Sequence, residues 1–306
     1  MAAGEGKGWS KGRTAATDAR VARNASRHLG LDYVRRTPIE LCRWPSGASL
    51  RGPIGWSPRM AYVVGLVATD GCLVTGQRRI DFSSADRQLV ETYLECLGRD
   101  PARYRVDRTA LGRPLYRVQL KDAEFYRWLL GIGLTPRKSL TLGGLSVPDE
   151  HLVHVVRGLL DGDGTILHRT SAADTTRRPD RSYQYEWFRA RFISASRDHV
   201  AWLQGRLRDA LSVTGAIATN ERDGRTTMFK LEFGRWDSMR LCAWLYADRT
   251  APCLDRKRAI WLSYAERHSA DVAIALDSRT SAIARAAVAR WARRDSNPHA
   301  LTSRSP

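Results

Sequence analysis

The sequence predicts an α+β protein that contains two similar repeats. The first supporting observation is a ten-residue segment, Tyr62–Gly71, that recurs as Val155–Gly164 with five identical positions. The second is the order of elements, because a helix, strands, a helix, strands and a further helix are expected from each copy onward. A repeated motif with the same elements after it indicates two copies of one structural unit.

Each copy has the pattern of an apolar helix with a glycine at mid-length and an Asp-Gly end. A glycine inside a helix costs about 1 kcal/mol relative to alanine. An aspartate at the carboxyl end opposes the helix dipole by roughly 0.3–1 kcal/mol. Both costs are explained if the helices cross at Gly65 and Gly158 and bring Asp70 and Asp163 side by side to a bound cation. The glycines that follow these acids are expected to close the helices in the left-handed conformation: Gly71 and Gly164.

The elements after each copy are expected from hydrophobic spacing and turn residues. The first repeat has a turn at 75–76, a strand at 78–82, a helix opened by 83–86, strands near 102–106 and 115–120, a helix at 123–131 and a loop at 134–139. The second has a strand at 191–196, a helix over 200–211, a strand at 228–233, a helix at 239–246 and a loop at 255–258 in the place of 136–139.

The second repeat has gained roughly eighteen residues relative to the first, between about 168 and 191. This stretch is more basic than acidic. A basic excursion of the hairpin beside the motif suits a DNA-reading loop, since phosphate neutralisation gives affinity and bases are read in the major groove. A solvated run of charges is the alternative interpretation.

Charge and composition restrict the possible partners. The chain of 306 residues carries a formal net charge of +18, which indicates a polyanionic partner, nucleic acid by default. The alternative is a generally arginine-rich protein without such a partner. No apolar run reaches the roughly 18 to 20 residues of a membrane span, and the amino terminus does not open a secretory signal. A cytoplasmic protein, associated with the nucleoid when bound to DNA, is therefore expected.

The five cysteines show no C-x-x-C pair, so no zinc site is expected. They are interpreted as reduced and mostly buried small hydrophobic residues. The chain is divided into four parts: a basic extension and linker at 1–60, the first repeat at 61–148, the second repeat at 149–268, and a basic helical and disordered tail at 269–306.

Each motif is followed by a serine-containing turn, at 83–86 and 194–196, then by a helix and, further on, by a lysine. Together these features resemble the LAGLIDADG homing endonucleases in their single-chain form with two motifs. The resemblance covers roughly residues 61 to 262. It implies a monomer with pseudo-two-fold symmetry, in which two αββαββα units pack through the motif helices. Their two curved antiparallel sheets would form a saddle over the major groove of a long, asymmetric DNA site.

The resemblance also implies a reaction, the hydrolysis of both DNA strands with Mg²⁺ or Mn²⁺ to leave short 3′ overhangs, as in intron mobility. By their place in the motif, Asp70 and Asp163 would bind the metal together with Gly71 and Gly164. Mg²⁺ prefers a few carboxylates plus phosphate oxygens, and metals lower the pKa of the attacking water. The other catalytic residues implied are two lysines, with a phosphate contact or a surface charge as the alternative: Lys138 and Lys257.

The sequence departs from the family pattern at three positions. Ala68 replaces the first acid of the motif, whereas the second copy keeps Asp161. Arg157 replaces a small residue beside Gly158, so it is expected either to strain the helix packing or to point outward. Asp161 is expected to cap, to pair with an arginine or to have no role.

The strand residues that alternate along the sheets supply the candidate DNA contacts. They are Arg78, Arg79, Asp81, Arg117, Gln119, Arg169, Arg177, Arg178, Arg189, Arg191, Lys230 and Glu232. Their placement depends on strand register, because a shift by one residue moves every side chain to the other face.

The sequence therefore predicts a site-specific DNA endonuclease acting on double-stranded DNA. The alternative is a binding protein on the same scaffold, either an RNA maturase that binds a group I intron or a DNA-binding regulator that does not cleave. An acid in both motifs favours the enzyme, since a protein that only binds does not need Asp70 and Asp163 at unfavourable helix ends.

Overall fold

A computed structural model describes residues 54–172, 184–221 and 226–277, all within one compact unit, Arg43–Pro306. Some predicted features lie outside the described residues: the basic extension before residue 54, the DNA contacts Arg177 and Arg178, and the alanine- and arginine-rich end of the chain.

The first repeat has the predicted order of helices and strands. Its elements are α2 (Pro58–Asp70), β1 (Gly71–Val74), β2 (Arg79–Ser84), α3 (Arg87–Cys96), β3 (Arg105–Arg108), β4 (Pro114–Lys121) and α4 (Ala123–Gly131). The strands form one antiparallel sheet in the order β1-β2-β4-β3. The strand β1, which is only four residues long, was not predicted from the sequence.

The second repeat has the same order and the same sheet topology. A short 3₁₀ turn, η2 (Asp149–His151), precedes α5 (Leu152–Gly162), and the repeat continues with β5 (Thr165–Ala172), β6 (Gln184–Ser194), α6 (Arg197–Leu211), β7 (Ala216–Asn220), β8 (Met228–Glu232) and α7 (Arg235–Leu245). The sheet order is β5-β6-β8-β7, again antiparallel. The predicted α+β class, with two antiparallel sheets, is confirmed.

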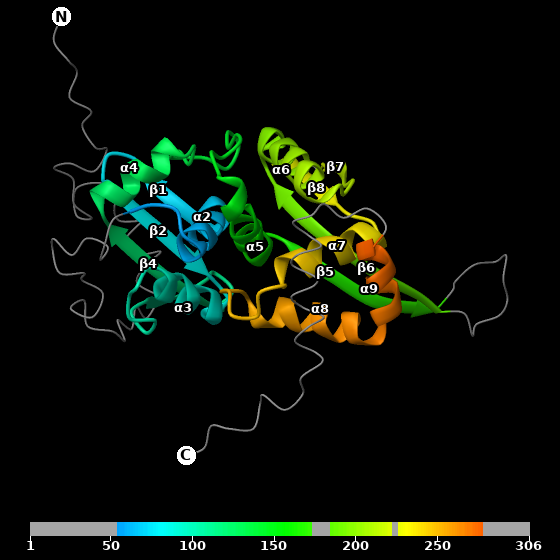
Figure 1. The fold of residues 1–306 in the computed structure, drawn as a ribbon. Coiled ribbons are helices and arrows are strands. Elements are labelled where there is room, and N and C mark those ends of the chain that lie inside the picture. The colour runs from blue at the N-terminus through cyan, green and yellow to red at the C-terminus, as the bar shows by residue number, and fades with distance from the viewer. Residues whose placement is uncertain (1–53, 173–183, 222–225, 278–306) are drawn as a thin grey trace, which may run out of the picture. The chain divides into compact units, whose positions relative to one another are not determined.

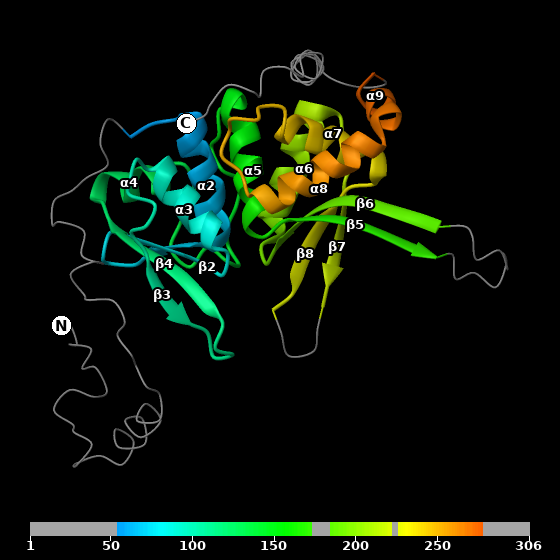
Figure 2. The same cartoon turned by 90° about the horizontal axis from the view of Figure 1, so that it is seen from below.

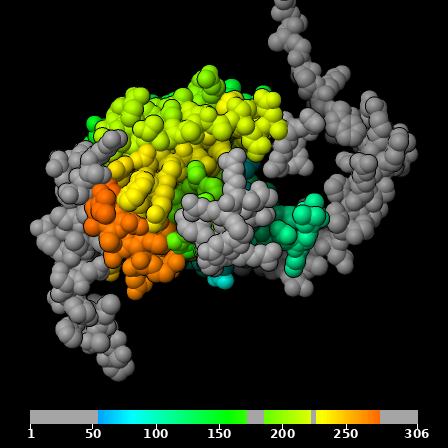
Figure 3. Space-filling model, turned by 90° about the vertical axis from the view of Figure 1, so that its right-hand side faces the viewer, coloured from blue at the N-terminus to red at the C-terminus, as the bar shows by residue number. Residues whose placement is uncertain are grey.

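The last two helices correct the sequence analysis. The stretch 255–258, expected to be a loop, is the first turn of α8 (Asp255–Arg267). Buried residues on α8 recur at helical spacing, at Lys257, Trp261, Tyr264 and Ala265. The helix α9 (Ser269–Asp277), placed in the tail by the sequence, packs on α7 through buried Val272, Ala275 and Leu276. Figure 3 shows α9 in orange beside the yellow segment that includes α7.

The helices of each repeat cover one face of its sheet, and the apolar core lies between them (Figure 2). In the first sheet Ile80, Phe82, Val118 and Leu120 are buried, while the residues between them are more exposed. In the second sheet the corresponding buried residues are Ile166, Ala190, Phe192 and Leu231. This alternation fixes which strand residues face away from the helices.

The two repeats are joined by α2 and α5, which lie side by side between the sheets (Figure 1). Their glycines meet at the crossing. A Cβ at Gly65 would lie 2.2 Å from the Val155 carbonyl oxygen and 2.8 Å from the Gly158 Cα. A Cβ at Gly158 would lie 2.4 Å from the Tyr62 carbonyl oxygen. No other residue type allows the two backbones to approach this closely.

The glycines after the two motif acids have a different role from the expected one. Gly71 has φ −90° and ψ 156°, which is extended backbone, and Gly164 is not among the residues with positive φ. The left-handed helix ends predicted from the sequence are therefore wrong. Glycine is required because the chain folds back on its own helix: a Cβ at Gly71 would lie 2.7 Å from the Val67 Cα, and one at Gly164 would lie 2.6 Å from the Leu160 Cα.

None of the helices in the described part of the chain is long and apolar enough to cross a membrane. Among the four cysteines described there, Cys242 and Cys253 are buried, Cys96 is partly buried and Cys72 is exposed.

The glycine crossing predicts a contrast between two alanine substitutions. We expect Gly65→Ala to lower the free energy of unfolding by about 3 kcal/mol or more, because the added Cβ overlaps backbone atoms of α5. Gly205→Ala in α6 is the control, since a Cβ there has nothing within 4 Å. We expect it to raise stability by about 0.5–1 kcal/mol. Urea unfolding measures both, and equal effects would contradict the close crossing.

Candidate active site

The motif acids lie at neighbouring helix ends. Asp70 is the last residue of α2, and Asp163 follows the last residue of α5. Gly162 lies between the two ends, because a Cβ there would be 2.0 Å from the Thr69 hydroxyl oxygen and 2.9 Å from an Asp70 carboxylate oxygen. The glycine crossing therefore delivers both acids to one place.

Both acids are electrostatically unfavourable in the protein as it stands. Burial, and secondly the neighbouring Asp163, raise the pKa of Asp70 to about 6. Asp163 is more exposed, but loss of solvent around its carboxyl still raises its pKa. Asp70 accepts one 3.5 Å hydrogen bond, from Thr69. Within the described ranges, neither carboxylate has an ion-pair partner. Two unpaired carboxylates side by side are what a bound cation would stabilise.

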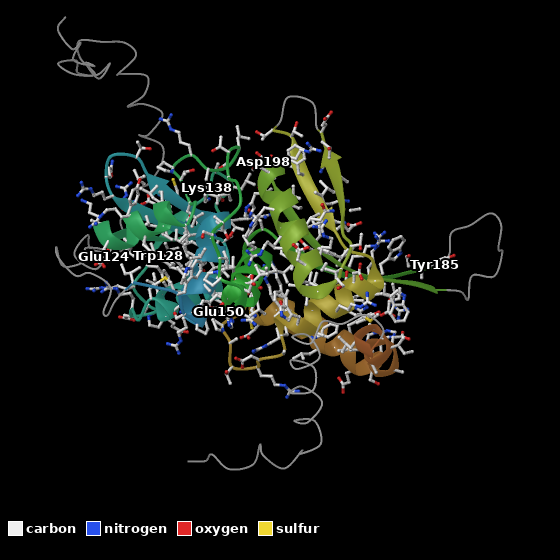
Figure 4. The ribbon with its side chains drawn as sticks, turned by 45° about the horizontal axis from the view of Figure 1, so that its top comes forward. Glu124, Trp128, Lys138, Glu150, Tyr185 and Asp198 are labelled. Carbon is white, nitrogen blue, oxygen red and sulfur yellow. The ribbon has the colours of Figure 1, made fainter. Side chains whose placement is uncertain are left out.

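The two lysines predicted to be catalytic lie at the same helix ends. The Lys138 ammonium donates to the carbonyl oxygens of Thr69 (3.4 Å) and Gly71 (2.7 Å). Lys138 belongs to the segment after α4 and is labelled in Figure 4. Both acids act electrostatically on its ammonium group. Its burial lowers its pKa.

Lys257 has the corresponding place in the second repeat. Its ammonium donates to the carbonyl oxygens of Leu160 (2.5 Å), Asp161 (2.9 Å) and Gly164 (2.7 Å). Burial lowers the pKa of Lys257 to about 8. The structure thus brings together the four residues that the sequence predicted to be catalytic, and it ties both lysines to backbone carbonyls.

The motif glycines predicted to bind metal offer only their carbonyl oxygens. These oxygens, on Gly71 and Gly164, already accept hydrogen bonds from Lys138 and Lys257. No group of three or more His, Cys, Asp or Glu side chains in the described parts of the chain could hold a metal ion. Asp70 and Asp163 alone still fit Mg²⁺, which commonly takes one or two protein carboxylates and completes its shell with water and substrate phosphate.

Asp161 belongs to the internal structure of the second repeat. It is 1% exposed, and one carboxylate oxygen accepts 2.8 Å hydrogen bonds from the Tyr62 hydroxyl and from the Leu254 N–H. Leu254 caps the amino end of α8. The carboxylate of Asp161 therefore ties α2, α5 and α8 together. Its aligned residue, Ala68, instead lines a cavity of about 30 Å³ beside Thr69, Asp163 and His199.

Arg157 corrects a second expectation, because its side chain does not point outward. It is 1% exposed, and its Nε donates a 2.7 Å hydrogen bond to the carbonyl oxygen of Leu245, the last residue of α7. A second guanidinium nitrogen lies 3.1 Å from His154 Nδ1. Arg157 therefore caps α7, since a cation stabilises the last carbonyls of a helix.

The strand register places the predicted DNA contacts on one face of each sheet. Paired and alternating positions put nine of them on the faces not covered by helices: Arg79, Asp81, Arg117, Gln119, Arg169, Arg189, Arg191, Lys230 and Glu232. Arg78 lies in the turn before β2, exposed and with φ 44°. The register that the sequence left open is thus decided by the buried positions between these residues.

These faces carry pre-formed charge networks. In the first sheet, Arg79 pairs with Asp81 at 2.7 Å and Gln119 donates to the same carboxylate at 3.1 Å. In the second sheet, Arg189, Arg191 and Lys230 all pair with Glu232. Sequence reasoning missed further members of the faces, because their signal is only strand alternation: Arg105, Asp107, Lys121 and Trp187. Trp187 lies under the guanidinium groups of Arg169 and Arg189, at 5.7 and 4.9 Å.

The hairpin of β5 and β6 is longer than its counterpart of β1 and β2. It pairs from Thr165 with Arg191 to Ala172 with Gln184, whereas β8 joins β6 only from Arg191 onward. Part of the stretch gained by the second repeat therefore lengthens these strands. Figure 4 labels Tyr185 near the outer end of β6.

Comparison with known proteins identifies the first repeat. Residues 57–131 match the family model described as a LAGLIDADG-like domain. The match contains the first motif, its sheet and α4. No curated protein matches the sequence significantly.

Among solved structures, I-DmoI in complex with DNA and Ca is similar at 14% identity and a TM-score of 0.42, covering 69% of this chain and 98% of that one. I-WcaI bound to its DNA recognition sequence gives 10% identity and a TM-score of 0.43, covering 77% and 96%. The N-terminal LAGLIDADG domain of DUF199/WhiA gives 16% and 0.41, covering 68% and 90%. These likenesses are too weak to support a conclusion about activity. Residues 57–131, the first repeat, are thus similar to the LAGLIDADG-like domain family.

Proposed function

We propose that the chain is a site-specific DNA endonuclease that makes a double-strand break at a long, asymmetric site with a divalent metal, Mg²⁺ or Mn²⁺. The observation that carries the proposal is the meeting of Asp70 and Asp163, two carboxylates without ion-pair partners among the described residues, at adjoining helix ends. Because one chain supplies both acids, the protein acts as a monomer. We also propose a role in intron mobility, which the resemblance to the homing endonucleases implies.

The two acids would hold the cation, and the uncovered sheet faces would hold the DNA. When bound, the cation would neutralise charge on the scissile phosphate and lower the pKa of the attacking water. Arginines and Lys230 on the faces neutralise backbone phosphates, which gives most of the affinity. Glu232, Asp81 and Gln119 supply acceptors and donors for base edges in the major groove. The network of Arg189, Arg191 and Glu232 orders these side chains before DNA arrives.

A protein that binds nucleic acid without cleaving it is the alternative, either an RNA maturase or a DNA-binding regulator. The sheet faces serve that alternative equally well. The unfavourable acids do not, because a protein that only binds a polyanion gains nothing from two carboxylates that lack a counter-ion. The endonuclease is therefore the function that the site supports best.

Removing either acid is expected to abolish double-strand cleavage. We expect Asp70→Asn and Asp163→Asn to lower the rate in Mg²⁺ at least about 100-fold, with binding in Ca²⁺ retained. Cleavage of a randomised or host-genomic duplex library, read by sequencing the ends, measures this. Asp86→Asn at the amino end of α3 is the control. Tight binding of one site by the wild type without cleavage would establish the alternative, and loss of cleavage in only one variant would refute equal roles for the acids.

The raised pKa of Asp70 predicts that a substitution which abolishes cleavage also increases the free energy of unfolding. The pKa of Asp70 is raised from 3.8 to about 6, so its contribution to stability is present below pH 3.8 and is lost as the pH rises through 6. In EDTA at pH 7.5, Asp70→Asn should therefore raise the free energy of unfolding, by up to about 3 kcal/mol. At pH 4 most of the gain should be gone, because the carboxyl is protonated in the folded protein and is only partly ionised in the unfolded chain. Urea unfolding at both pH values tests this, and Asp86→Asn should show no gain.

The uncovered faces predict a salt-dependent loss of DNA affinity. Arg117 lies on the open face of β4, whereas Arg87 is exposed on α3, on the side of the helices. We expect Arg117→Ala to weaken binding to random-sequence duplex and to reduce the salt slope by about one. Arg87→Ala should leave both unchanged. Fluorescence anisotropy across a salt series measures the slopes, and equal losses would place the DNA elsewhere.

A further inference from the structure

The lysines at the motif helix ends are held away from the open surface. Lys138 is 6% exposed and Lys257 is 3% exposed. Every hydrogen bond recorded for their ammonium groups goes to a backbone carbonyl oxygen at the end of α2 or α5. An ammonium group has three protons, and Lys257 uses all three in this way. No proton of Lys257 therefore remains for a phosphate, a water or a metal-bound ligand, and one proton of Lys138 remains.

Three of the bonded carbonyls, those of Thr69, Leu160 and Asp161, are in the last turns of α2 and α5, where a helix end leaves carbonyls without an N–H partner. The other two, of Gly71 and Gly164, follow directly after the motif acids. Neither helix has a basic residue in its own last turn, and neither ends in a left-handed glycine. The lysines, which come from 67 to 97 positions away in the sequence, supply these caps. Their charge also offsets the negative end of each helix dipole, which the acids make more negative.

The same bonds fix the backbone on both sides of each acid. Thr69 and Gly71 flank Asp70, and both of their carbonyl oxygens accept from Lys138. Asp161 and Gly164 bracket Asp163, and both accept from Lys257. Loss of either lysine would free the peptide units from which an acid projects.

We propose that Lys138 and Lys257 are positioning residues, which hold the two acids in place through the helix ends and touch neither the DNA nor the reacting atoms. This inference rests on the proposed function, in which Asp70 and Asp163 bind the metal. It revises the catalytic role that the family resemblance implied for the lysines.

The two caps are unequal. Lys257 lies on α8, and the amino end of α8 is itself tied to α5 by the bond from the Leu254 N–H to the Asp161 carboxylate. Lys138 lies on a segment without helix, makes two bonds, and has Ala68 where the other half has Asp161. Lys257 makes three bonds at the end of α5, whereas Lys138 makes two at the end of α2. Replacing Lys257 should therefore reduce the protection of its helix end from hydrogen exchange by more than replacing Lys138 does.

The test compares a substitution that removes the donor with one that keeps it. Lys257→Met keeps the length of the side chain but donates nothing, whereas Lys257→Gln has an amide donor and no charge. The same pair is made at Lys138. The first readout is hydrogen–deuterium exchange of the full chain in EDTA, followed at residues 67–73 and 160–166. The second is the rate of cleavage in Mg²⁺.

We expect each Met variant to speed exchange at its own helix end at least about tenfold and to lower the cleavage rate about 10- to 100-fold. The effect should be larger at Lys257, and the Gln variants should recover most of both readouts. Arg87→Met, exposed on α3 on the side of the helices, is the control and should leave both exchange at the two helix ends and the cleavage rate unchanged.

Two results would overturn the proposal. One is a pair of folded Met and Gln variants that abolish cleavage equally while exchange stays at the wild-type level, which would assign the lysine charge a direct chemical role. The other is unchanged exchange together with unchanged cleavage. If a Met variant does not fold, its Gln variant still decides the result. If the wild type cuts no DNA, the proposed function fails, and the exchange readout still decides whether the lysines fix the helix ends.

Discussion

The close crossing of α2 and α5 is the contact on which the rest of the structure depends. Gly65 and Gly158 allow the backbones to touch, and a Cβ on either would overlap atoms of the other helix. The same closeness brings the helix ends together, where Gly162 lies against Thr69 and Asp70. Because β1 begins directly after α2, and only two residues separate the end of α5 from β5, the crossing also places the start of both sheets.

The adjoining ends of α2 and α5 are electrostatically unfavourable, because Asp70 and Asp163 lie there. Acids at helix ends oppose the dipole, and burial together with mutual repulsion raises the pKa of Asp70. The buried ammonium groups of Lys138 and Lys257 reduce that cost, but they bond to backbone carbonyls, and within the described part of the chain neither carboxylate has an ion-pair partner. A site where residues are electrostatically unfavourable, and where neighbouring residues compensate for this, is typical of a functional site.

The two motif copies keep the same acid at their ends but differ at buried positions. Asp161 and Arg157 use their side chains to connect α5 with α8 and α7, while the aligned Ala68 and Val64 make no such polar connection. The second repeat is therefore the more cross-linked half. The protein keeps a matched pair of acids on two supports that are built differently.

The sequence by itself determined the motif helices, their crossing glycines, the pair of acids and most of the order of elements, because these depend on local patterns and on one duplication. It did not predict the strands β1, β5 and β7. It could not determine the partners of Lys138, Lys257 and Arg157, which lie far away along the chain. Nor could it assign the first turn of α8, whose start is fixed by the distant Asp161. Only the tertiary structure decided which strand residues face outward, since register is set by packing against the helices and one shift reverses it.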